Sequence, residues 1–136
     1  TTSKVFLFYG HGAVDSINIS DGNFVGVSTL DIDLLVDSAL SNCELMVLCA
    51  CYTGTGKDGA NNFVNALVAK GVATAVGFTD QMYCSDITIW HPALFYQISR
   101  GMNVKNAAFA AIEGTDILAE QIYIAGDKTK TFTNGG

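Results

Sequence analysis

Basic residues and histidines are scarce in this sequence. Seven Lys and Arg residues face thirteen Asp and Glu residues, which gives a formal net charge of −6 at pH 7. This balance argues against nucleic acid as the main partner, because nucleic-acid binding needs a basic surface. It suits a cationic ligand or peptide, although such a charge also simply aids solubility. With two histidines and no C-x-x-C pair among four cysteines, the chain lacks the ligand pattern of a structural zinc site.

Long apolar runs are absent as well. No apolar segment approaches the length of a membrane span, and the apolar run near the N-terminus is too short for a signal peptide. We therefore expect no membrane partner. Cysteines in apolar runs are usually buried free thiols, which favours a reducing compartment and a cytoplasmic location. A length of 136 residues, 49% of them hydrophobic, suits one domain over residues 1–136 with a real core.

Three short apolar runs are present, and they indicate the fold class. They are Val5–Tyr9, Leu45–Ala50 and Val72–Phe78. Each is nearly continuous rather than alternating, which is typical of strands that are buried on both faces of a parallel sheet. Helical patterns lie between the runs. The sequence therefore predicts an α/β domain with a mainly parallel sheet flanked by helices and right-handed crossovers.

The remaining segments predict further elements around this sheet. Asp21-Gly22, between apolar residues, is a hairpin signal. A helix that carries Phe63 should end at Lys70 and Gly71, a cation followed by a C-terminal glycine. A helix over residues 85–101 should be strained or broken at Pro92. Another is predicted over residues 104–121, with Gly114 as a weak point, and residues 121–126 read as a last strand.

His11 and Cys51 are the candidate catalytic pair. His11 follows the first predicted strand and Cys51 follows the second. If these strands are parallel neighbours, their carboxyl ends lie side by side, and ligands of open α/β sheets bind just beyond those ends. An imidazole within reach of a thiol is the minimum for an activated cysteine nucleophile. Cys51 also lies shortly before a helix predicted to begin near Asp58, and a helix N-terminus stabilises a thiolate.

Glycines accompany both members of this pair. Gly10 and Gly12 let the backbone bend tightly around His11. The amides of Gly12 and Cys51 could then form an oxyanion hole, in which one donor is worth roughly 3–4 kcal/mol of barrier. The ordinary interpretations are a turn for "GHG" and a packed thiol for Cys51. Cys49 falls on the same face as its apolar strand neighbours and reads as core, and His91, beside Pro92, is given no catalytic role.

The loop after Cys51 offers a competing interpretation. Gly54, Gly56 and Gly59 satisfy G-x-G-x-x-G after a strand, and Asp80 follows at about the spacing of a ribose-binding acidic residue. These glycines do not lie in the turn that directly follows the strand, because Cys51, Tyr52 and Thr53 come first. A dinucleotide-binding loop would also leave His11 and Cys51 unexplained. It remains an alternative function, nucleotide binding. Lys57-Asp58 rules out a Walker A loop, which needs Ser or Thr after the lysine.

The motifs "FLFYGHG" and "LMVLCACYTG" resemble the His-Gly and Ala-Cys signatures of the caspase-like (clan CD) cysteine peptidases, and the CHAT group in particular. "FVNALVAKGVATAVGFTD" and "FYQISRGMNVKNAAFAA" are similar to later segments of that group, so the resemblance covers most of the chain to about Ala111. It implies a caspase-haemoglobinase-like three-layer sandwich. It also implies a cysteine endopeptidase in which His11 is the general base and Cys51 the nucleophile.

The resemblance has further implications for specificity and completeness. By position, Asp80 and Asp86 are the candidates to line the substrate pocket, which would favour a basic residue before the scissile bond. Neither metal nor organic cofactor is required, and the partner is a peptide or protein substrate. The chain begins at what would be the family's third strand, so the resemblance implies either a domain cut from a longer chain, without its N-terminal strands, or a minimal or inactive relative. The edge of the first strand should then be covered by a missing segment or by a second copy of the chain. The alternative function, from a class other than enzymes, is a catalytically silent caspase-like interaction or scaffold module.

Overall fold

The structure, a computed structural model, describes residues 5–10, 12–13, 16–18, 26–54 and 62–132. The elements formed by these residues follow in chain order. They are β1 (Val5–Tyr9), β2 (Gly12–Ala13), β3 (Ser16–Asn18), β4 (Gly26–Ser28), α1 (Thr29–Asp33), β5 (Leu45–Cys49), α2 (Phe63–Ala69), β6 (Thr74–Phe78), α3 (Cys84–Ser99), α4 (Val104–Ala110), a 3₁₀ turn (Ala119–Gln121) and β7 (Ile122–Gly126).

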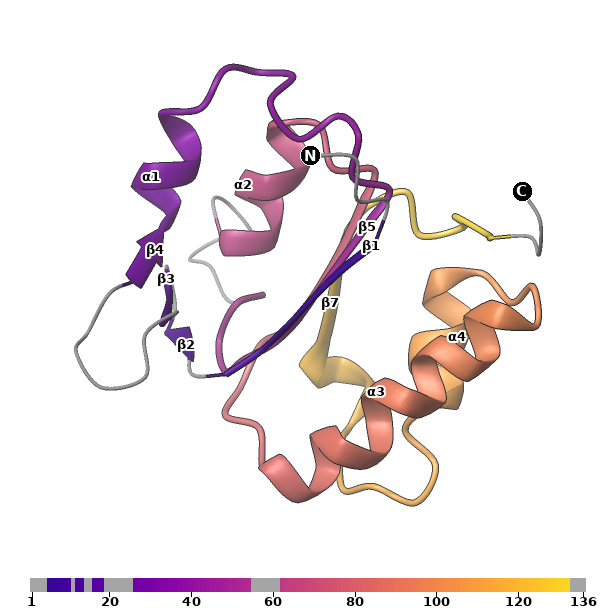
Figure 1. Cartoon of the computed structure of the whole chain (residues 1–136). Coiled ribbons are helices and arrows are strands. Elements are labelled where there is room, and N and C mark those ends of the chain that lie inside the picture. Colours follow the sequence, from indigo (N-terminus) through magenta and orange to yellow (C-terminus); the bar gives the residue numbers. More distant parts are fainter. Residues whose placement is uncertain (1–4, 11, 14–15, 19–25, 55–61, 133–136) are drawn as a thin grey trace.

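The main sheet has four strands in the order β1-β5-β6-β7 (Figure 1). β1, β5 and β6 run parallel, and β7 closes the sheet antiparallel to β6. All three predicted apolar runs form strands, and the expectation that the first two are parallel neighbours is confirmed. The register of these two strands places Tyr9 opposite Cys49. Burial on both faces holds for β5 and β6 but is wrong for β1, whose residues are exposed apart from the half-buried Phe8. Within the described part of the chain, no strand pairs with the other side of β1, which is therefore an edge strand.

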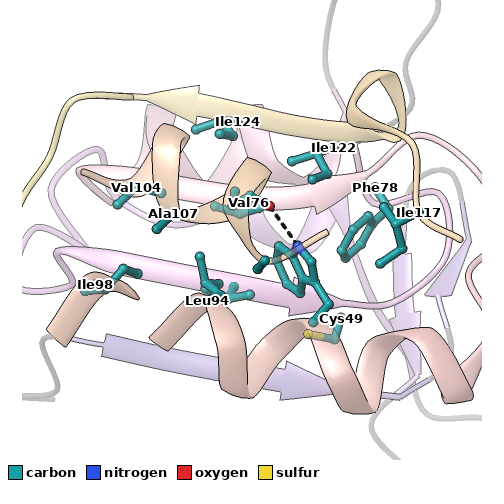
Figure 2. Packing of buried hydrophobic residues seen from close by; sticks show 14 of the residues in the cluster. Cys49, Val76, Phe78, Leu94, Ile98, Val104, Ala107, Ile117, Ile122 and Ile124 are labelled. Atoms are coloured by element: carbon teal, nitrogen blue, oxygen red, sulfur yellow. Dashed lines mark hydrogen bonds between the residues drawn. The ribbon is translucent and has the colours of Figure 1, made fainter. Parts of the chain in front are cut away.

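Helices cover both faces of this sheet, which gives the predicted three layers (Figure 1). α3 and α4 pack on one face against Leu45, Val47 and Cys49 of β5 (Figure 2). α2 packs on the other face against Leu48 and Ala50. Alternate residues of β5 thus enter different cores, which explains why this strand reads as a continuous apolar run. The expectation that Cys49 shares a face with Val47 and Leu45 is confirmed.

A second, three-stranded antiparallel sheet, β2-β3-β4, follows β1. β3 and β4 pair with Ser16 opposite Ser28, so the predicted hairpin is present. The Asp21-Gly22 turn itself lies outside the described residues. The separate sheet was not expected from the sequence, because strands of two and three residues are too short to show a period.

Two helix predictions need correction, and one is confirmed. α3 continues through Pro92 without a break. Trp90 and Leu94, on either side of the proline, are fully buried, and this packing outweighs the lost backbone hydrogen bond. α4 ends at Ala110, well before residue 121, and the chain then turns through Gly114 at φ +84°. α2 ends as predicted, with Gly71 at φ +115°.

The described residues contain no helix that is both long and apolar enough to cross a membrane. Within the same ranges, no group of three or more His, Cys, Asp or Glu side chains is arranged to hold a metal ion. All four cysteines are free thiols.

Candidate active site

The carboxyl ends of β1 and β5 are joined by a hydrogen bond. The Gly10 amide donates to the Cys49 carbonyl oxygen at 3.3 Å, which extends the parallel ladder by one step beyond β1. Gly10 and the loop after Cys49 therefore lie at the same edge of the sheet. His11 itself lies outside the described residues, and Gly12 begins β2.

The loop after β5 turns sharply at Tyr52. Its φ of 64° lies in the left-handed region, which a residue with a side chain enters only when its surroundings hold it there. Two backbone bonds to the end of β6 hold this turn. The Tyr52 amide donates to the Asp80 carbonyl at 3.2 Å, and the Gly54 amide donates to the Phe78 carbonyl at 2.8 Å. The segment that carries Cys51 is thus attached to the next strand of the sheet.

Thr53 fixes the inside of the same turn. Its side chain is fully buried. The hydroxyl donates to the Ala50 carbonyl at 3.2 Å and accepts from the Phe78 amide at 3.4 Å. The hydroxyl therefore joins the end of β5 to the end of β6 directly behind Cys51.

The Cys51 thiol lies against the segment that follows β6. Its Sγ accepts a hydrogen bond from the Met82 amide at 3.2 Å and donates to the Met82 carbonyl at 3.7 Å. These two contacts hold the sulfur against the segment after β6. The amide N–H of Cys51 has no partner among the residues that the structure describes.

Cys51 opens into a cavity of about 230 Å³. Three parts of the chain line it: the ends of β1 and β5, the segment after β6, and the first turn of α3. The described lining residues are Tyr9, Gly10, Cys49, Ala50, Cys51, Gln81, Met82, Cys84 and Ile87. Ligands of open parallel sheets bind at this position, beyond the carboxyl ends of neighbouring strands.

Two titratable groups in the wall are held neutral. Burial raises the pKa of the Cys49 thiol to about 12. A side-chain hydrogen bond with Cys84, together with burial, raises the pKa of the Tyr9 hydroxyl above its usual value. The Tyr9 ring also packs edge-on against the imidazole of His91, with 6.1 Å between centroids. His91 thus lies behind Tyr9, on α3.

The two predicted substrate-binding carboxylates lie beside this cavity and do not line it. Asp80 is exposed, and its carboxylate accepts from the Gln81 amide at 2.7 Å, which is the ordinary role of an Asp in a turn. Asp86 is 9% exposed and accepts from the Asp116 amide at 3.2 Å. It lines a smaller hollow of about 60 Å³ that shares Gln81 with the Cys51 cavity.

The described part of the glycine-rich loop has a packing role. A Cβ on Gly54 would lie 2.5 Å from the Cβ of Tyr123, so only glycine lets the loop pass β7. The Gly54 amide already binds Phe78 and is not free for a phosphate. Gly56 and Gly59 lie outside the described residues.

Sequence reasoning missed two contributions to this site. One is the backbone of Met82, whose contact with Cys51 depends on folding and leaves no trace in the sequence. The other is Thr53, whose position two residues after Cys51 was visible but whose buried partners were not.

No protein-family model matches this chain, and none of the curated proteins matches its sequence. A solved chain described as "Structure of Protease" matches it in structure, with a TM-score of 0.64 and 13% sequence identity. The match covers 93% of this chain and 35% of that one, so this chain spans about a third of that chain's length. At this identity the likeness establishes a shared α/β, protease-like fold.

Proposed function

We propose that this chain carries the catalytic site of a cysteine endopeptidase of the caspase-like class, with Cys51 as nucleophile and His11 as general base. The observation that carries the proposal is the joined end of β1 and β5. The Gly10–Cys49 hydrogen bond brings Gly10, which precedes His11 in the sequence, to the edge of the sheet where the Cys51 loop begins, beside a cavity that Cys51 lines. The protease-like fold and the His-Gly and Ala-Cys motifs support the same assignment.

The proposed chemistry follows the usual thiol route. His11 takes the proton of the Cys51 thiol as sulfur attacks the scissile carbonyl carbon, and the amides of Gly12 and Cys51 bind the oxyanion. The proton then passes from His11 to the leaving amine, and a thioester remains on Cys51. Water, deprotonated by His11, releases the acid and restores the thiol. Two observations support this sequence of steps: the Cys51 amide has no partner among the described residues, and the Met82 amide holds the sulfur in position.

The test is hydrolysis of fluorogenic peptides, with covalent capture by a peptide electrophile. Cys51→Ala should abolish both, and His11→Gln should lower kcat/KM by roughly 10²–10⁴-fold, as expected for loss of a general base. Cys43→Ser is the matched control, because Cys43 is a buried free thiol elsewhere in the core. Hydrolysis that survives Cys51→Ala would refute the assignment.

The silent-scaffold alternative predicts neither hydrolysis nor capture in the unaltered chain, so the same assay separates the two classes. The nucleotide-binding alternative loses one phosphate donor, because the Gly54 amide is bonded to Phe78. Equilibrium dialysis with a radiolabelled dinucleotide tests it directly.

A further inference from the structure

The wall of the Cys51 cavity carries no charged side chain among the residues that the structure describes. From this wall we infer that the cavity is the subsite for an uncharged, medium-sized apolar side chain, of the Leu or Met kind, immediately before the scissile bond. The inference rests on the proposed peptidase function and names its substrate class. It differs from the sequence-based expectation of a basic residue selected by Asp80 or Asp86.

The size of the cavity suits one side chain. At about 230 Å³ it is smaller than the roughly 300–1,000 Å³ of sites that take a drug-sized molecule. Ile87, 3% exposed, Met82 and Ala50 supply apolar lining. An unbranched Met side chain adapts its shape easily, so the wall can close on occupants of slightly different form.

The electrostatics of the wall disfavour a charged occupant. At neutral pH the Tyr9 hydroxyl and the Cys49 thiol are both uncharged, because the ordinary pKa of each lies above that pH and is raised further here. An Arg or Asp side chain would therefore leave water without gaining an oppositely charged partner here. The carboxylates of Asp80 and Asp86 accept from the backbone outside this wall.

The preference for an apolar over a charged residue before the scissile bond should be moderate. Burying an apolar side chain of this size in place of a charged one corresponds to roughly a tenfold to hundredfold difference in kcat/KM.

The experiment uses the full chain and a set of peptide acyloxymethyl ketones that differ only at the residue beside the reactive group. The set comprises Leu, Met, Phe, Gln, Arg and Asp. Intact-mass analysis follows the rate of the adduct on Cys51. Leu and Met probes should react at least tenfold faster than Arg and Asp probes. Equal rates, or a faster Arg probe, would overturn the inference, and an Arg preference that disappears in Asp86→Asn would establish the basic alternative.

A charge introduced into the wall sharpens the test. Cys84 is exposed and is the first residue of α3, where a negative side chain is favourable for the helix. Cys84→Asp should shift the rate ratio of Arg to Leu probes upward by at least tenfold. Cys84→Asn has the same shape without the charge, and it should keep Leu ahead of Arg. An unchanged ratio in Cys84→Asp would show that Cys84 does not face the occupied subsite.

The two proposals fail in different ways. If no probe labels Cys51 while iodoacetamide still does, the peptidase function is wrong, and the subsite assignment falls with it. If all probes label Cys51 at similar rates, the nucleophile stands and only the subsite assignment is lost.

Discussion

Thr53 offers a sharp test of how the nucleophile loop is held. Thr53→Val keeps the branched shape and removes the hydroxyl, which now bridges the Ala50 carbonyl and the Phe78 amide in a fully buried position. The substitution leaves both backbone groups without their partner in the protein interior. Each such group costs about 1–3 kcal/mol, and the long 3.4 Å bond to Phe78 contributes at the low end. We therefore expect the free energy of unfolding to fall by about 2–3 kcal/mol.

Urea denaturation measures this loss. With a slope of about 2 kcal/mol/M for a domain of this size, the midpoint should fall by roughly 1 M at unchanged slope. Thr53→Ser is the matched control, because it keeps the hydroxyl and loses one methyl group, worth about 1 kcal/mol. Catalysis should follow the same order, with kcat/KM lowered in the Val variant more than in the Ser variant. A Val midpoint equal to or above the Ser midpoint would refute the role given to the hydroxyl.

Two further predictions concern the thiols and the sheet edge. Cys51 should react with iodoacetamide faster than Cys43, Cys49 and Cys84. Raised pKa values leave little thiolate on the two buried thiols, and at pH 8 a thiol of pKa about 12 reacts roughly three orders of magnitude more slowly than an ordinary one. Peptide mapping of the carbamidomethyl adducts checks the order, which uniform slow labelling would contradict. Leu7, 39% exposed on the edge strand β1, should support pairing with a second copy of the chain. Leu7→Lys should then lower the sedimentation coefficient, whereas a parent chain that is already monomeric would exclude this pairing.

The strands that could be predicted best from the sequence are those that are buried on both faces of the sheet. Leu45–Cys49 reads as a buried strand because both of its faces enter a core. The pairing of β1 with β5 could be expected because the segment between them is long enough for the crossover that parallel strands require. Pro92 misled the prediction for α3, because local propensity says nothing of the burial of Trp90 and Leu94 around it.

At the site, the same limit applies to contacts between distant segments. The sheet edge beside Cys51 could be predicted from strand order alone. The amide of Met82 could not, since it reaches sulfur only through the fold of the segment after β6. Asp80 and Asp86 were chosen by sequence position, which does not tell which hollow a side chain lines; their role in substrate binding stays a prediction.

The attachment of the Cys51 loop has a consequence for how such chains diverge. The loop is held by main-chain atoms of Phe78, Asp80 and Met82, and a main-chain contact persists when the side chain changes. Mutation can therefore rewrite the residues of that segment, and with them the lining of the cavity, while the sulfur stays in place.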